Sequence, residues 1–273
     1  MRIHVSHATS YRYDPPALGA IQVLRLTPRN HQGQYVLSWR IDVSEGCRLQ
    51  AHEDAFGNLS HTFAVEGPLS ELRVSVEGEV ETQDTAGVVL GSVERFPPSL
   101  YLRQTELTEP GPALRGFAEQ AAIGGDPLGR LHALMAELHE SMSFEPDPAL
   151  AVGTAAAAFA QKRGACQDFA HAYIACARHL GIPARYVSGY RLDDAPGTPS
   201  ETGHAWAEAY VDGFGWVAFD CAHKLCATEA YVRVAVGLDY LGAAPVRGNR
   251  YGGGEELLSV AVAVDQSSRQ IQG

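Results

Sequence analysis

The sequence predicts an α+β protein in which an antiparallel β-sandwich precedes a mixed domain of helices and strands. Apolar and polar side chains alternate with a period of two over several runs in the first 80 or so residues, as in half-buried strands. Helical patterns begin only after residue 112, and further strand-like runs follow them. We therefore predict a β-sandwich over residues 1–85 and a second domain, with its connector, over residues 86–273.

Three alternating runs define the predicted sandwich. They cover residues 35–43, 59–65 and 72–80, and residues 54–58 carry the Asp, Gly and Asn residues of a turn. The following stretch, residues 82–112, is irregular and rich in proline, which is typical of a connector.

The second domain shows three helical patterns and several strand patterns. Asp126-Pro127 is a helix start, Ala155–Gln161 is a short alanine-rich helix, and a third helix begins at about Cys166 and ends at Gly181. The glycine-rich stretch Arg247–Glu255 is predicted to be a loop. The strand-like runs cover residues 204–211, 216–220, 231–236 and 257–264.

Bulk properties exclude several functional classes. The net charge of −11 argues against nucleic-acid or anionic-membrane partners. No apolar run reaches the roughly 18–20 residues of a membrane helix, and the N-terminus lacks the basic-then-apolar order of a secretion signal, so we expect a cytoplasmic protein. The five scattered cysteines favour reduced thiols over a disulfide scaffold.

Cys166 is the candidate nucleophile. An apolar stripe follows it at helical spacing, so the cysteine lies in the first turn of a helix. Helix N-termini favour negative charge, and their free N–H groups can also stabilise an oxyanion. The thiolate, which is the reactive form of cysteine, is therefore favoured at this position. Taken alone, the helix favours a buried structural cysteine over a catalytic one, because free cysteines often fill protein cores.

His204 and Asp220 are the candidate base and its orienting acid. Residues 204–211 alternate, so His204 shares one face with Trp206 and Glu208, while a small apolar face remains for packing on a helix. A hairpin turn of four residues would place His204 and Asp220 on opposite faces of the sheet. A turn of three or five residues, or a bulge, would make them neighbours, and we predict this arrangement.

Taken singly, these residues have simpler interpretations. His204 alone could be a polar strand residue, Asp220 alone could be an acid that ends a strand, and Glu208 is expected to be a solvated charge. The three residues Cys166, His204 and Asp220 together indicate a Cys-His-Asp triad, in which a carboxylate fixes the imidazole tautomer.

The segments around these residues resemble the transglutaminase-like core of bacterial proteins. The resemblance covers most of the chain and includes the region before the core, which resembles the N-terminal region of bacterial members. It implies a papain-like α+β domain with Cys166, His204 and Asp220 as the triad. One departure is that many relatives continue after the acid with Pro, then Thr or Ser, then Asn, whereas this chain has Cys221-Ala222-His223. The matching runs are Gly164–Ala170, Gly181–Tyr190, Gly203–Trp206, Gly215–Asp220, Val232–Gly237 with Asp239-Tyr240, Leu24–Arg29 and Asp54–Asn58.

The predicted reaction is acyl transfer through a thioester, with a peptide or amide as substrate. The resemblance favours hydrolysis, with cross-linking of glutamine to an amine as the alternative and a non-catalytic binding module as the alternative of another class. Trp206 and Tyr190 are expected to line the acyl groove.

No cofactor and no metal are expected. The glycines at 252–254 lack the strand-to-helix context of a phosphate-binding loop. Cys221, His223 and Cys226, even with His179, match no common zinc spacing, and Asp193-Asp194 lacks the spacing of a calcium loop.

Overall fold

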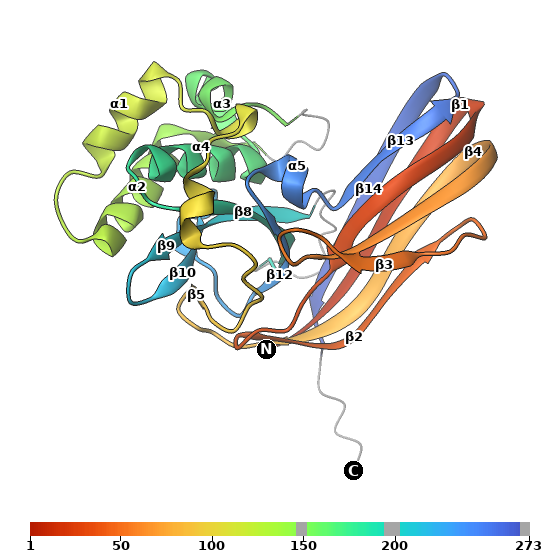
Figure 1. The fold of residues 1–273 in the computed structure, drawn as a ribbon, viewed down its shortest axis with the longest axis horizontal. Helices are drawn as coiled ribbons and strands as arrows, with labels where there is room; N and C mark the ends of the chain where they lie inside the picture. Colours follow the sequence, from red (N-terminus) through yellow and green to blue (C-terminus); the bar gives the residue numbers. More distant parts are fainter. Residues whose placement is uncertain (146–151, 194–202, 268–273) are drawn as a thin grey trace, which may run out of the picture.

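The part of the chain that the structure describes contains two six-stranded β-sheets and a short two-stranded pair, and one of the large sheets carries a group of helices on one face (Figure 1). The computed structural model describes residues 1–145, 152–193 and 203–267. Asp194, one of the two aspartates considered as a calcium ligand, therefore lies outside the described residues.

The first sheet is antiparallel and is built around two long strands that pair along most of their length. β14 and β13 pair with the first and second halves of β1, and β2 and β3 pair with the two halves of β4. Its strands are β1 (Arg2–Thr27), β2 (Gln34–Val43), β3 (Gln50–Glu53), β4 (Leu59–Thr82), β13 (Val246–Gly252) and β14 (Glu255–Gln266).

The two halves of this sheet enclose one apolar cluster. Leu24 and Phe63 from one half pack in the same cluster as Leu72 and Val74 from the other half. A sandwich thus forms from a single continuous sheet. Two of its strands, β13 and β14, come from residues 246–266, which the sequence analysis had grouped with the second domain.

The prediction of a loop over Arg247–Glu255 is wrong, because most of this stretch is strand β13. A Cβ atom at Gly248 would lie 2.4 Å from the carbonyl oxygen of Ile21 on the neighbouring strand. The glycine therefore allows a close approach of two strands, and it does not mark a turn.

The second sheet has the order β11-β10-β9-β8-β12, with β5 pairing β10. The strands predicted around residues 204–211, 216–220 and 231–236 are confirmed within one residue of their ends. The strands are β5 (Val88–Val89), β8 (Ala184–Arg191), β9 (His204–Val211), β10 (Gly215–Asp220), β11 (Leu225–Cys226) and β12 (Tyr231–Gly237), and a separate short pair is β6 (Ser143–Phe144) with β7 (Arg163–Gly164).

The helices gather around α4, which lies against the second sheet (Figure 1). The small side chains of Ala205, Ala207 and Ala209 on β9 belong to the same core cluster as α4. Gly181, at φ +77°, ends the helix, and the N–H of Ile182 donates to the carbonyl of Ala177 at 2.9 Å. The helices are α1 (Pro112–Ala121), α2 (Pro127–Ser141), α3 (Ala155–Gln161), α4 (Cys166–His179) and α5 (Tyr240–Ala243), with 3₁₀ turns η1 (Pro98–Leu102) and η2 (Glu106–Thr108).

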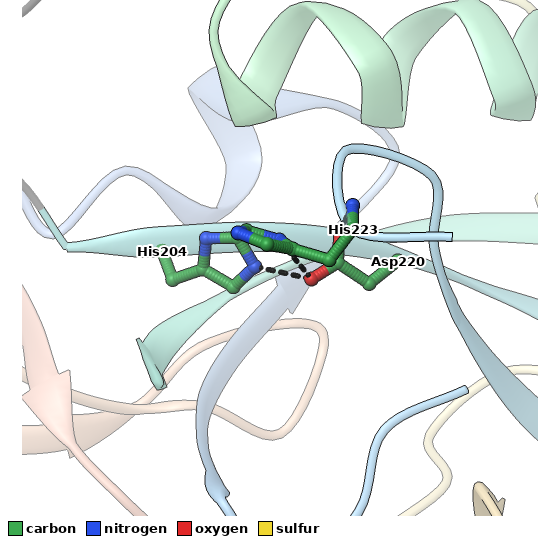
Figure 2. Close-up of side chains that lie close together, drawn as sticks. All are labelled: His204, Asp220 and His223. Carbon is green, nitrogen blue, oxygen red and sulfur yellow. Dashed lines mark hydrogen bonds and ion pairs between the residues drawn. The ribbon is translucent and has the colours of Figure 1, made fainter. Parts of the chain in front are cut away.

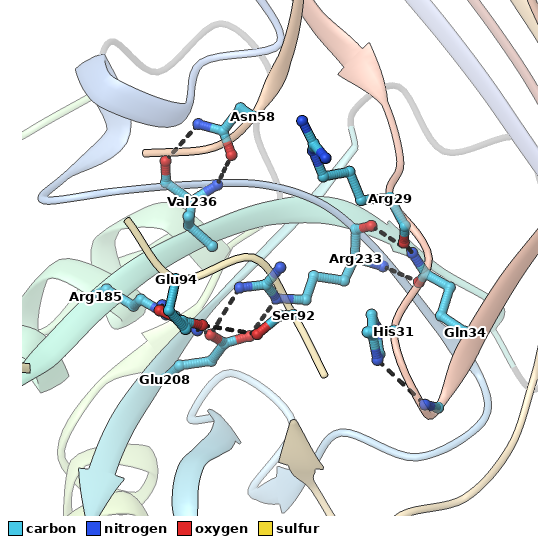
Figure 3. A network of polar contacts seen from close by, with 11 residues as sticks. Arg29, His31, Gln34, Asn58, Ser92, Glu94, Arg185, Glu208, Arg233 and Val236 are labelled. Atoms are coloured by element: carbon cyan, nitrogen blue, oxygen red, sulfur yellow. Dashed lines mark hydrogen bonds and ion pairs between the residues drawn. The ribbon is translucent and has the colours of Figure 1, made fainter. Parts of the chain in front are cut away.

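Amide side chains from the first sheet region join the two sheets at the outer edge of β12 (Figure 3). The amide of Gln34 donates to the carbonyl of Arg233 and accepts from its N–H, at 2.8 and 2.7 Å. The amide of Asn58 likewise donates to the carbonyl of Val236 and accepts from its N–H, and both hydrogen bonds are 2.8 Å long. These amides satisfy backbone groups that an edge strand would otherwise leave unpaired.

A buried ion network lies beside this junction (Figure 3). The carboxylate of Glu208, which is 0% exposed, accepts from Arg185 at 2.6 Å and from Arg233 at 2.7 Å. Arg185, 1% exposed, also makes a two-point contact with Glu94. The expectation that Glu208 is solvated is therefore wrong, because a buried carboxylate on this face is neutralised by two guanidinium groups.

We predict that Glu208→Gln lowers the free energy of unfolding by about 3–5 kcal/mol, because Arg233 and Arg185 lose the buried carboxylate that they share. Burial alone would raise the pKa of Glu208, but Arg233 and Arg185 lower it from 4.5 to about 2. Since the folded-state pKa is the lower one, this stabilisation is present above pH 4.5 and is lost as the pH falls toward 2.

Urea unfolding at several pH values measures both effects. Glu119→Gln is the matched control, because its carboxylate is 65% exposed and pairs with His179 at the surface, so its effect should stay within about 0.5 kcal/mol. Equal losses in the two variants would contradict a stabilising role for the buried network.

Candidate active site

His204 and Asp220 meet at one end of the second sheet. Val211 pairs with Gly215, so residues 212–214 form a three-residue turn between β9 and β10. This odd number places the two side chains on the same face, as predicted. The imidazole Nε2 of His204 lies 2.6 Å from Oδ2 of Asp220 (Figure 2).

The carboxylate of Asp220 is 1% exposed and has several partners. Its Oδ2 accepts from the hydroxyl of Tyr231 at 2.7 Å and lies 2.9 Å from Nδ1 of His223. Burial by itself would raise the pKa of Asp220, but the two histidines, His204 foremost, hold it well below its usual range. The carboxylate of Asp220 is therefore expected to stay ionised although it is buried.

This charge determines the state of His204. Burial alone would lower the pKa of His204, but the Asp220 carboxylate and, to a smaller extent, the Cys166 side chain raise it to about 10. This shift favours the imidazolium form of His204 at neutral pH, and Nε2 is the ring nitrogen that faces Asp220, so Nδ1 is left for a second group.

Cys166 is the first residue of α4 and is 7% exposed. Its side chain and that of His204 line the same cavity, which has a volume of about 210 Å³. The backbone before the helix is held by Asp168, whose Oδ2 accepts from the N–H of Ala165 at 2.9 Å. A Cβ atom at Gly164 would lie 2.6 Å from the Cβ atom of Asp168, so the close approach of residue 164 to Asp168 requires a glycine.

The other four cysteines lie in places that disfavour a thiolate. Burial raises the pKa of Cys47, Cys176, Cys221 and Cys226. A neutral thiol is a weak nucleophile, so these residues fit structural roles.

The positions of Trp206 and Tyr190 do not match the expectation that they line the acyl groove. Trp206 is 2% exposed and packs beside His204 and Tyr231, on a different, smaller cavity. The hydroxyl of Tyr190 lies 2.9 Å from Nδ1 of His7 in the first sheet. Trp206 packs against His204 on one face of the second sheet, whereas Tyr190 lies on the opposite face and contacts the first sheet through His7.

His223 contacts Asp220, a role that was not predicted from the sequence, where this residue was considered only as a metal ligand and as part of the departure from the family pattern. Its Nε2 lies 3.3 Å from a guanidinium nitrogen of Arg191, which can only donate. Nδ1 therefore carries the proton and donates to Asp220 (Figure 2). The signal was the departure from the family pattern, since His223 occupies the position of the expected Asn, whose amide N–H can serve the same acceptor.

Metal binding has one geometric candidate among residues 1–145, 152–193 and 203–267. The ligand atoms of His204, Asp220 and His223 lie within 4.8 Å of one another. Hydrogen bonds between the two rings and the carboxylate explain this proximity fully, so we assign no metal here. The cysteines at 221 and 226 do not join such a group.

Sequence profiles and a relative show the family of this chain. The profile of the bacterial transglutaminase-like N-terminal region matches residues 3–81, and that of the transglutaminase-like superfamily matches residues 115–221. An uncharacterised protein of Mycobacterium leprae is 30% identical over 96% of this chain and 98% of its own length. This chain belongs to the transglutaminase-like superfamily.

Two further proteins are similar to this chain along most of its length. An uncharacterised protein of Mycobacterium tuberculosis is 27% identical over 97% of this chain and 92% of its own length. The crystal structure of "a Putative Cysteine Protease from Cytophaga hutchinsonii" superposes with a TM-score of 0.75 at 19% identity, covering 99% of this chain and 92% of that one. This transglutaminase-like chain thus shares the fold of both its sheets with that protein. No helix in the described ranges is long and apolar enough to span a membrane.

We predict that His223→Ala lowers the free energy of unfolding by about 1.5–3 kcal/mol, because the buried Asp220 carboxylate loses a hydrogen-bond donor. His223→Asn, which places an amide N–H near the position of Nδ1, should recover at least half of that loss. Chemical denaturation of the two variants measures the difference. Equal losses for Ala and Asn would show that the ring acts by packing and not by donating to Asp220.

Proposed function

We propose that this protein is a cysteine-dependent enzyme that hydrolyses a peptide or amide bond. The observation that carries the proposal is that Cys166 and His204 line the same cavity. The Nε2 atom of His204 lies 2.6 Å from Oδ2 of Asp220. In this proposal Cys166 is the nucleophile, His204 the acid and base, and Asp220 the group that orients and charges the ring.

The first half of the reaction forms a thioester. The thiolate of Cys166 attacks the carbonyl carbon, and the oxyanion is stabilised by N–H groups at the start of α4. The imidazolium of His204 gives its proton to the leaving amine as the C–N bond breaks. The amine departs and the acyl group remains on sulfur.

The second half releases the acyl group. His204, now neutral, takes a proton from water, whose oxygen attacks the thioester carbonyl. The C–S bond breaks, a carboxylic acid leaves, and the thiolate–imidazolium pair is restored. An amine in place of water would give a new amide, which is the transamidation alternative. The resemblance to a protein named as a cysteine protease supports water as the acceptor.

We predict that iodoacetamide at pH 6 alkylates Cys166 faster than the other four cysteines, whose pKa values are raised by burial. His204→Ala should remove this preference, because the charged ring that stabilises the thiolate is gone. Mass spectrometry of digested protein locates the label. Slow and equal labelling of all five cysteines would favour a non-catalytic binding module on this fold.

We also predict that peptide amides are cleaved by the wild type and that Cys166→Ala lowers the rate by on the order of 10³-fold or more. Methylamine added to the reaction distinguishes the two chemistries. A product that is mainly the free acid supports hydrolysis, whereas a product that is mainly the methylamide would establish transamidation.

A further inference from the structure

The cavity beside Cys166 has walls from both sheets. Cys166, His204 and Tyr186 stand on the core side, and strands β1 and β14 of the first sheet stand opposite. Tyr11 pairs with Leu258, and Thr9 pairs with Val260, so these four side chains are cross-strand neighbours on one face. The far wall is therefore a continuous patch of the N-terminal sandwich.

Two polar side chains of this wall, His7 and Thr9, already have hydrogen-bond partners. His7 lies 2.9 Å from the hydroxyl of Tyr190 and 3.0 Å from that of Thr9, and burial lowers its pKa to about 4, which keeps the ring neutral. On the core side, the hydroxyl of Ser188 donates to the carbonyl of Ala243 at 2.7 Å. What remains toward the cavity is mainly aromatic and aliphatic surface.

Charge is confined to the reacting groups. Among the described residues that line the cavity there is no Asp, Glu, Lys or Arg. A charged side chain of a substrate placed here would lose water without gaining a counter-charge, which is costly. An apolar side chain would instead gain contact with the walls.

The size of the cavity suits one large side chain. Its volume is about 210 Å³. An apolar cavity of about 150 Å³ in another protein holds benzene, so a ring or a branched aliphatic group fits in this space.

We propose that the first sheet, through β1 and β14, forms the wall of the cavity that selects the substrate, which we call the specificity wall. In this proposal the cavity takes an uncharged apolar side chain of the peptide next to the bond that is cleaved. This inference rests on the proposed function. It assigns Tyr11, Leu258 and Val260 as the residues that select the substrate, and it gives the N-terminal domain a part in recognition.

The test uses N-acetyl aminoacyl chloromethyl ketones of Leu, Phe, Glu and Lys. The thiolate of Cys166 displaces chloride from the chloromethyl carbon, so a C–S bond forms and a C–Cl bond breaks. Each second-order rate, measured by mass spectrometry at Cys166, is divided by the rate with iodoacetamide. We expect the Leu and Phe compounds to react at least about tenfold faster than the Glu and Lys compounds.

Leu258 and Leu257 offer a matched pair of variants. They are adjacent on β14 and 53% and 64% exposed, but only Leu258 lines the cavity. Leu258→Glu should slow the Leu and Phe compounds by about tenfold and make the Lys compound the fastest of the four. Leu257→Glu should retain the wild-type order, since alternate strand residues face opposite sides.

The experiment distinguishes a failure of the specificity wall from a failure of the proposed enzyme function. Equal rates for the four compounds in the wild type, or equal changes in the two variants, would overturn the specificity wall while rapid labelling of Cys166 still supported the enzyme. No preferential labelling of Cys166 by any of these electrophiles would overturn the proposed function and this inference with it.

Discussion

The carboxylate of Asp220 is buried at the end of β10, and it can remain charged there only because donors converge on it from three elements. His204 reaches it from β9, Tyr231 from β12, and His223 from the turn that follows β10. Its charge in turn keeps the His204 ring protonated beside Cys166. The rest of the fold is arranged so that these elements end at the same place.

The first sheet contributes to this arrangement from outside the core domain. Gln34 and Asn58 hold the free edge of β12, and Tyr231 lies at the start of that strand. The same sheet presents β1 and β14 to the cavity beside Cys166. The two sheets thus share the walls of one cavity, and buried polar contacts hold them together beside it.

Local patterns carried enough information to predict the positions of the helices and the strands around the site. The alternation in residues 204–211 and the odd turn determine that His204 and Asp220 share a face, and these depend only on neighbours in sequence. The tertiary partners were not readable in this way. In the sequence, Gly248 has the pattern of a loop residue, and only the tertiary structure shows that it allows its strand to lie close to Ile21. Glu208 likewise has the pattern of a solvated acid, and only the tertiary structure shows its contacts with Arg185 and Arg233. His223 has a role only because the turn after β10 returns it to Asp220.

The central claim is that the buried carboxylate keeps His204 positively charged in the resting protein. Nuclear magnetic resonance of ¹⁵N-histidine-labelled protein tests it directly, with His204→Gln to assign the ring signals. We predict that His204 remains an imidazolium through neutral pH and titrates near 10 in the wild type, and that Asp220→Asn lowers this midpoint by several pH units. A midpoint near the ordinary 6.5 in both proteins would contradict the account.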